Sequence, residues 1–257
     1  MKDFLYRVYK IRKVKDNLDI YGIRSVIEAI KSKEKTIDKI FIQIGLTGRL
    51  INELEALIRK NKLKSSYVPT QKLNRLSKKN HQGVIARISP IKFYEINQII
   101  AEIEKKKDAL ILILDQINDV RNFGAIIRTA EVSGVDAIII QNQSSAPINA
   151  DTVKTSAGGV FNVPICKVSH IKDAIYHLKS SKVMVIAASE KAKKNIYDLS
   201  LKKSVAIIMG SEERGISSSV LKLSDEVVKL PMFGKIESLN VSVASGIFLY
   251  EVIRQRI

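Results

Sequence analysis

The sequence of 257 residues has few of the residues that build disulfide frameworks or metal sites. Its single cysteine, Cys166, excludes intramolecular disulfides, and its apolar context NVPICKV is typical of a small core residue rather than a nucleophile. The three histidines, His81, His170 and His177, show no metal-ligand spacing with this cysteine. We therefore expect no metal site.

Long apolar runs are also missing. No run approaches the roughly 20 residues that a membrane-spanning helix needs. The N-terminal segment MKDFLYRVYKIRKVKD has charges every few residues and no apolar core of the signal-peptide type. We therefore expect a cytoplasmic protein, and its hydrophobic fraction of 46% is enough to bury a substantial core.

Negative charge is scarce in the first part of the chain. The net charge is +17, and residues 1–107 hold 25 basic and 11 acidic side chains, against 18 and 15 in residues 108–257. A lysine-rich genome would enrich the whole chain without separating the charges in this way. The N-terminal part is thus the better candidate for a phosphate-binding surface with salt-sensitive affinity.

Alternating helical and strand patterns predict an α/β protein with two domains. A basic tail (1–18) precedes a small domain (19–90), and a linking helix (91–108) leads to a larger domain (109–257). The small domain is expected to have helices at 23–32, 47–61 and 70–78, and strands at 38–44, 66–68 and 83–88. The larger domain has almost wholly apolar strands at 109–114, 135–140, 183–188 and 204–209. Such strands are typical of a parallel sheet that is covered on both faces.

Three polar segments are the candidates for a ligand site: NFGAIIRTA from Asn122, MGSEERGIS from Met209 and LPMFGKIESLNVSVA from Leu230. The first two follow apolar strands, and ligands of open parallel sheets bind beyond the carboxyl ends of the strands. The third is a polar loop that contains glycine and runs into a long helix. These segments should be interpreted together.

Common nucleotide motifs do not fit these segments. The turn at Asn122 lacks the G-x-G-x-x-G spacing of a dinucleotide site. Gly210 and Gly215 have the glycine spacing of a P-loop, but Ile216 and Ser217 stand where it requires Lys and Ser/Thr, which disfavours ATP hydrolysis. A Ser-His-Asp signature, a zinc ligand set and a nucleophile elbow are also missing.

The three segments resemble, in order and type, the motifs of the SpoU (TrmH) family of RNA ribose 2'-O-methyltransferases. The resemblance extends over the whole of 109–257. The small domain, with YGIRSVIEAI and NHQGVIARI, is similar to the ribosomal-protein-L30e-like domain of the 23S rRNA members, although Arg24 stands where many of them have histidine. The resemblance implies a trefoil-knotted (SPOUT-type) α/β domain with a mainly parallel sheet, behind a small N-terminal α/β domain that binds RNA. It also implies S-adenosylmethionine as cofactor and a homodimer through the C-terminal domain, whose active sites include residues from both subunits.

The resemblance further assigns the site residues. Those assigned to catalysis and ribose-phosphate positioning are Asn122, Arg128, Glu212, Ser238 and Asn240. Those assigned to the cofactor are Gly210, Leu230 and Leu239, through their backbone, and Ile208, Met209 and Met232, which would line its pocket.

Elementary chemistry qualifies two of these assignments. Arginine has a pKa above about 12 and accepts protons poorly, so we expect Arg128 chiefly to bind phosphate and stabilise the developing oxyanion. Asn240 is expected both to cap the last helix and to belong to the site. For the apolar stripe of that helix, periodicity leaves core packing and a dimer contact equally open. The stripe consists of Val241, Ala244, Phe248 and Val252.

The sequence thus predicts a methyltransferase that transfers a methyl group from S-adenosylmethionine to the ribose 2'-OH of a guanosine in 23S rRNA. A tRNA ribose 2'-O-methyltransferase is the alternative with the same chemistry, disfavoured because typical tRNA members lack the small domain. An enzyme that modifies another rRNA nucleotide, as in thiostrepton resistance, is a further alternative. A noncatalytic RNA-binding ribosome-assembly protein is expected to lose some of the polar residues assigned above, and all are present.

Overall fold

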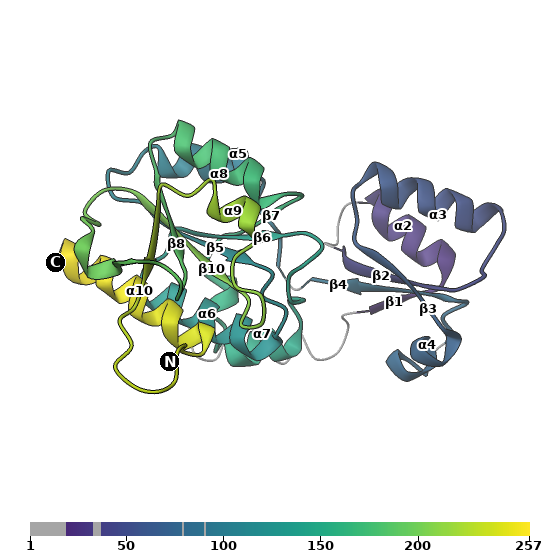
Figure 1. Cartoon of the computed structure of the whole chain (residues 1–257). Helices are drawn as coiled ribbons and strands as arrows, with labels where there is room; N and C mark the ends of the chain where they lie inside the picture. The colour runs from purple at the N-terminus through teal and green to yellow at the C-terminus, as the bar shows by residue number, and fades with distance from the viewer. Residues whose placement is uncertain (1–18, 33–36, 79, 90) are drawn as a thin grey trace, which may run out of the picture. The chain divides into compact units, whose positions relative to one another are not determined.

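The computed structural model describes residues 19–32, 37–78, 80–89 and 91–257. The chain divides into two compact units, which are coloured from purple to yellow along the chain in Figure 1. The first comprises the residues up to 92 together with 147–150, and the second comprises 93–146 and 151–257. The predicted basic tail, 1–18, lies outside the described residues.

The N-terminal unit is a four-stranded sheet with helices on both faces. Its elements are β1 (Asp19–Tyr21), α2 (Ile23–Ser32), β2 (Ile37–Gln43), α3 (Arg49–Lys60), β3 (Ser65–Val68), α4 (Thr70–Leu76) and β4 (Val84–Ile88). The strand order is β1-β4-β2-β3, and β4 is antiparallel to both of its neighbours. The apolar stripes of α2 and α3 pack on one face of the sheet, whereas α4 covers part of the other.

The C-terminal unit is built on a seven-stranded sheet in the order β7-β6-β5-β10-β8-β11-β9, in which every strand pair is parallel. Its strands are β5 (Leu110–Asp115), β6 (Ala137–Gln141), β7 (Ile165–Val168), β8 (Met184–Ala188), β9 (Lys194–Asn195), β10 (Val205–Gly210) and β11 (Glu226–Lys229). Its helices are α5 (Ile96–Ile103), α6 (Val120–Val132), α7 (Ala150–Thr155), α8 (Ile171–Ser180), α9 (Ser218–Leu221) and α10 (Val241–Arg256), with 3-10 turns at Gly159–Phe161 and Ile196–Asp198.

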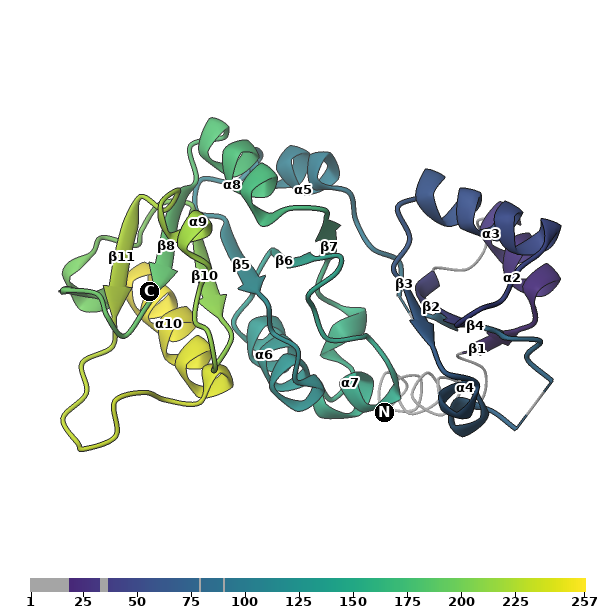
Figure 2. The same ribbon diagram turned by 45° about the vertical axis from the view of Figure 1, so that its right-hand side comes forward.

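Helices cover both faces of this parallel sheet. Figure 2 shows α5, α8 and α9 on one face and α6 and α10 on the other. Burial on both faces explains why the strands are almost wholly apolar. The predicted α/β class, the mainly parallel C-terminal sheet and the additional small α/β unit are confirmed, and the trefoil knot stays a prediction.

The segment 91–108 contributes to the C-terminal core, whereas its pattern predicts a helix that links the domains. Its helix, α5, is shorter than the pattern, and Ile99 and Ile103 are buried in a cluster with α8 and the sheet. The backbone of Tyr94 forms an isolated parallel β-bridge with Cys166 of β7. The Cys166 side chain is itself fully buried, and this burial raises the pKa of its thiol to about 12. It is therefore a core residue, as its context predicts.

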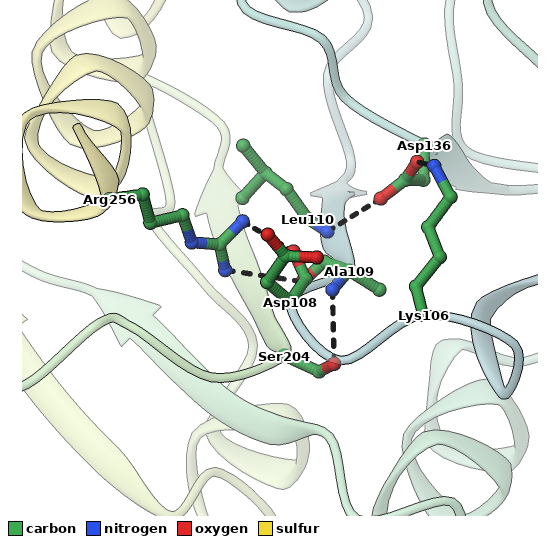
Figure 3. Close-up of polar contacts among 7 residues, drawn as sticks. All are labelled: Lys106, Asp108, Ala109, Leu110, Asp136, Ser204 and Arg256. Atoms are coloured by element: carbon green, nitrogen blue, oxygen red, sulfur yellow. Dashed lines mark hydrogen bonds and ion pairs between the residues drawn. The ribbon is translucent and has the colours of Figure 1, made fainter.

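The C-terminal end of α10 is fixed near the amino end of β5 (Figure 3). The Arg256 guanidinium donates to the carbonyl oxygens of Asp108 at 2.5 Å and Lys203 at 2.7 Å. On the other side of the same strand end, Asp136 accepts from the N–H of Leu110 at 2.8 Å. Hydrogen bonds from a charged donor are among the stronger ones, so α10 is held at this end while its first turn lies at the opposite edge of the sheet.

Candidate active site

A cavity of about 450 Å³ lies at the carboxyl ends of β8, β10 and β11. Three segments line it: 188–191 after β8, 209–215 at the end of β10, and parts of 229–248. Apolar and polar groups contribute to the lining, which is typical of sites for small ligands with both kinds of surface. The cavity occupies the sheet edge that the sequence predicts for a ligand.

Five of the six residues assigned to the cofactor line this cavity: Met209, Gly210, Leu230, Met232 and Leu239. Met232 and Leu239 are 37% and 38% exposed, so both present apolar surface to solvent at the cavity. Ile208 differs from the assignment. Its side chain is fully buried in the core cluster that contains α8 and α9, because alternate residues of β10 face opposite sides of the sheet.

Asn240 connects the three predicted polar segments. Its Nδ2 donates to Glu212 Oε1 at 2.6 Å and to Asn122 Oδ1 at 3.0 Å. Its Oδ1 accepts from the N–H of Ser242 at 3.0 Å, which caps α10. Glu212 Oε1 also accepts from the N–H of Val241 at 3.2 Å, so the carboxylate lies at the positive end of the helix. Asn240 therefore both caps the helix and belongs to the cluster.

A tight turn after β10 presents Glu212. The N–H of Ser211 donates to Gly215 O at 3.2 Å, and the N–H of Gly215 donates to Ser211 O at 2.8 Å. A Cβ on Gly210 would lie 2.2 Å from the carbonyl carbon of Gly215, so the strand end must be glycine for the turn to close. Gly215 itself has φ +65°, in the left-handed region.

A second cavity, of about 260 Å³, lies beside the first. Its lining consists of 116–119 and Asn122 together with 211–214 and Val241, so the two cavities share the turn that carries Glu212. Gln116 has φ +62°, an unusual conformation for a residue with a side chain and one that is frequent at functional sites. Asp119 caps α6 by accepting from the N–H of Asn122 at 2.7 Å, which holds Asn122 at the cavity.

The structure brings Asn122, Glu212 and Asn240 into contact and places Ser238 in the wall of the first cavity. The hydroxyl of Ser238 has no hydrogen-bond partner in the described part of the chain. Arg128 lies outside both cavities: its side chain is exposed on α6 and forms no hydrogen bond or ion pair with any described residue. The neighbouring Ile126 and Ile127 are fully buried, as their pattern predicts.

The helix α10 is apolar on two faces. Val241, Phe248 and Val252 are buried, which identifies the stripe that the sequence leaves open as core, while Ala244 lines the first cavity. On the outer face, the exposed side chains of Val243 (52% exposed) and Tyr250 (50% exposed) and the half-buried Ile247 line a shallow depression with residues of α6. An apolar face of a helix is typically covered by another element or another chain.

Sequence reasoning misses two features of the site. The first cavity is also lined by the residues directly after β8, Ser189, Glu190 and Lys191. The sequence signal that could have identified them is a run of polar residues directly after an apolar strand. Asp115, at the end of β5, is 2% exposed and accepts from the N–H of Ser217 at 2.8 Å, which ties that strand end to the segment after β10. The sequence signal that could have identified Asp115 is a single carboxylate at the end of an otherwise apolar strand.

The described residues show neither a metal-binding cluster nor a membrane-spanning helix. Among the described residues there is no group of three or more His, Cys, Asp or Glu side chains that could hold a metal ion. In the same ranges no helix combines the length and the apolar character that crossing a bilayer requires.

The fold and the candidate site define an α/β protein with a cavity beyond the carboxyl ends of a parallel sheet and a polar cluster at the border of that cavity. The chain belongs to the SpoU rRNA methylase family, whose model matches residues 109–250. A second model, described as RNA 2'-O ribose methyltransferase substrate binding, matches residues 20–94. The resemblance found in the sequence is thereby confirmed.

Known proteins are similar to almost the whole chain. The 23S rRNA (guanosine-2'-O-)-methyltransferase RlmB of Vibrio vulnificus is 34% identical over 93% of this chain and 97% of its own length. A Staphylococcus haemolyticus protein assigned to the TrmH family of tRNA/rRNA methyltransferases is 36% identical over 94% of this chain and 97% of its own. An AdoMet-bound rRNA methyltransferase from Sinorhizobium meliloti aligns with a TM-score of 0.61 over 97% of this chain and 95% of that chain, at 21% identity, which shows a shared fold.

Proposed function

We propose that this protein transfers a methyl group from S-adenosylmethionine to the ribose 2'-OH of a guanosine in 23S rRNA. The observation that carries the proposal is the contact of Asn240 with Asn122 and Glu212, which joins all three family motifs between two adjoining cavities. Membership of the family supports the chemistry. The similarity of the whole chain to RlmB of Vibrio vulnificus supports the rRNA substrate.

The first cavity fits S-adenosylmethionine by the chemistry of its lining. Met209, Leu230 and Leu239 offer apolar surface to an adenine ring, while Glu190 and Ser238 offer oxygen atoms to hydroxyl and ammonium groups. The bound cofactor would supply a methyl group on a positively charged sulfur. Residues of this chain must then hold the ribose oxygen in line with that methyl group and stabilise the negative charge of the oxygen as its proton passes to water.

The second cavity is the proposed place of the target ribose. Asn122 and Glu212 both line it, and the hydrogen bonds of Asn240 fix the position of both side chains. Because Glu212 Oε1 already accepts from two donors, we assign Glu212 to holding the cluster rather than to taking up the ribose proton. Most of the catalytic effect is then positioning, which requires rigid partners.

Arg128 is proposed to act in the neighbouring subunit of a homodimer. It lies outside both cavities of its own chain, on α6, whose Ala125 and Thr129 line the depression beside the exposed apolar face of α10. A symmetric partner seated on this face would cover Val243 and Tyr250 and bring Arg128 to the partner. There its guanidinium would bind the substrate phosphate.

A methyl-transfer assay tests the proposal. S-adenosylmethionine labelled in its methyl group is incubated with unmodified 23S rRNA transcript or with unmodified tRNA, and incorporation into each RNA is measured. We expect label in the 23S transcript, at one guanosine whose phosphodiester bond has become resistant to alkali. Arg128→Ala should abolish transfer while leaving cofactor binding intact, because Arg128 does not line the cofactor cavity.

The assay also separates the alternatives. Incorporation into tRNA alone would identify the tRNA enzyme, which the name of the Staphylococcus haemolyticus relative also covers. Label at another nucleotide of the 23S transcript would retain the chemistry and change the target. Failure of both cofactor binding and transfer with either RNA would reject the methyltransferase.

A further inference from the structure

We infer that Lys39 and Arg87 form a binding site for a backbone phosphate of the substrate RNA, on the face of the N-terminal sheet that carries α4. The inference rests on the proposed function, since it names the surface by which the small unit holds the RNA. It concerns the side of the sheet opposite α2 and α3.

The strand register aligns the first two cations. Lys39 of β2 pairs with Arg87 of β4, and Arg87 pairs with Asp19 of β1, so the three side chains form one row across the sheet. The next row on the same face contains Ile85 and Phe41, which pack against α4. The row of charged residues therefore lies beside an apolar cluster and shares the face that α4 covers only in part.

The two cations are compensated only in part. Like charges directly opposite each other in an antiparallel pair repel. Arg87 Nε is 3.2 Å from Asp19 Oδ1, whereas Lys39 has no ion-pair partner among the residues that the structure describes. Lys39 Nζ and Arg87 Cζ lie 5.2 and 5.6 Å from the centre of the Phe41 ring, so one ring is shared by both.

The surroundings of Lys39 already disfavour its positive charge. The pKa of Lys39 is lowered, first by partial burial, then by the charges of Lys72 and Arg87, while Asp38 opposes the effect. An ordinary surface lysine would avoid all three penalties by extending into water. A bound anion would remove the repulsion and give Lys39 the ion-pair partner that it lacks among the described residues.

A nucleic-acid phosphate is the anion that this unit favours. Residues 19–92 contain 16 Lys or Arg and 6 Asp or Glu, so a polyanion is attracted to the unit as a whole. Contacts to phosphate position a nucleic acid without reading its sequence. The site would thus contribute affinity and orientation, while target choice is made elsewhere.

The test compares variants of the full-length protein, of which Lys39→Gln and Lys60→Gln remove one positive charge each and Lys39→Glu reverses the charge. Lys39→Gln and Lys39→Glu alter the site, and Lys60→Gln is the control, because Lys60 is exposed at the end of α3 on the other side of the sheet. Binding of fluorescein-labelled unmodified 23S rRNA fragments is measured from low to high salt. Denaturation midpoints and methyl transfer at saturating RNA are recorded for each variant.

We expect Lys39→Gln to weaken RNA binding about fivefold or more and to lower the salt slope by about 1, and Lys39→Glu to weaken binding further. Lys60→Gln should change the affinity by less than about twofold. The denaturation midpoint of either Lys39 variant should equal or exceed that of the wild type, because repulsion is relieved. A purely structural lysine would instead lower midpoint and affinity together.

Equal effects of Lys39→Gln and Lys60→Gln would overturn the inference, since they would mean diffuse attraction without a site. Unchanged RNA affinity in both Lys39 variants would overturn it as well, whatever other ligand the surface takes. Failure of the proposed phosphate site can be distinguished from failure of the proposed methyltransferase function. A wild-type protein that binds RNA through Lys39 but transfers no methyl group would retain the site and reject the enzyme.

Discussion

Asn240 combines a structural and a site role in one side chain. Its Oδ1 caps α10, and its Nδ2 holds Asn122 and Glu212. Asn240→Ser should keep the cap, since serine caps helices about as well as asparagine, but it is too short to reach both partners. We expect methyl transfer to fall about 100-fold in this variant, as when one positioned donor is removed from an active site. Initial rates with labelled S-adenosylmethionine measure the loss.

Asn240→Ala separates the two roles further. Removal of the cap should lower the free energy of unfolding by about 1 kcal/mol, whereas the serine variant should stay within about 0.5 kcal/mol of the wild type. Both variants should lose activity to a similar extent. If Asn240 were only a cap, Asn240→Ser would transfer methyl groups at the wild-type rate, and that result would contradict the site.

At the scale of elements, the end of β10 and its turn depend on one close approach. Alanine at Gly210 would place its Cβ against the backbone of Gly215 and Ile216, so the turn that carries Glu212 must move. Gly210→Ala should lower the free energy of unfolding by about 1–3 kcal/mol, as overpacking does. It should also weaken cofactor binding and transfer. Calorimetric titration with S-adenosylmethionine and chemical denaturation measure the two effects.

Gly234→Ala is the matched control in the stretch between β11 and α10. A Cβ on Gly234 meets no atom within 4 Å, and its φ lies outside the left-handed region, so alanine fits there without strain. Stability should be unchanged or higher by up to about 1 kcal/mol, because alanine restricts the unfolded chain. Equal loss of cofactor binding in both variants would contradict this explanation, because it would mean that the loss does not depend on the close approach of Gly210 to Gly215.

Elements with one clear apolar period can be predicted from this sequence, whereas a short strand with polar ends cannot. The pattern over 23–32 predicts α2 (Ile23–Ser32) with its boundaries, since its apolar stripe faces a single core. By contrast, β11 (Glu226–Lys229) is short and polar at both ends, and only Val228 is fully buried. Such a segment contains too few residues for a period of two to be recognised.

The site could be predicted in its composition but not in its contacts. Family motifs assign Asn122 and Asn240, yet 118 residues separate them, and no local pattern predicts that they touch. In β10 every residue is apolar because both faces are covered, so periodicity cannot tell that Ile208 faces the core and Met209 the cavity. These assignments require the three-dimensional sheet.

At the scale of the whole molecule, the two units have different tasks in the proposed reaction. The cavities and the polar cluster belong to the C-terminal unit, and most of the excess positive charge lies before residue 108. Affinity for RNA and chemistry are therefore separable by mutation. Arg128, however, lies away from the cavities of its own chain, and in the proposed homodimer a second chain would complete the site.

Complementation between two inactive chains tests this assignment of Arg128. In a heterodimer of Arg128→Ala and Asn240→Ser subunits, an arginine that acts across the interface leaves one site with both native residues. Random pairing should then restore about a quarter of the wild-type rate in an equimolar mixture. An arginine that acts within its own chain leaves every site damaged. Coexpression with two affinity tags, purification of the heterodimer and measurement of methyl transfer distinguish the two cases, because an inactive heterodimer would show that Arg128 acts within its own chain.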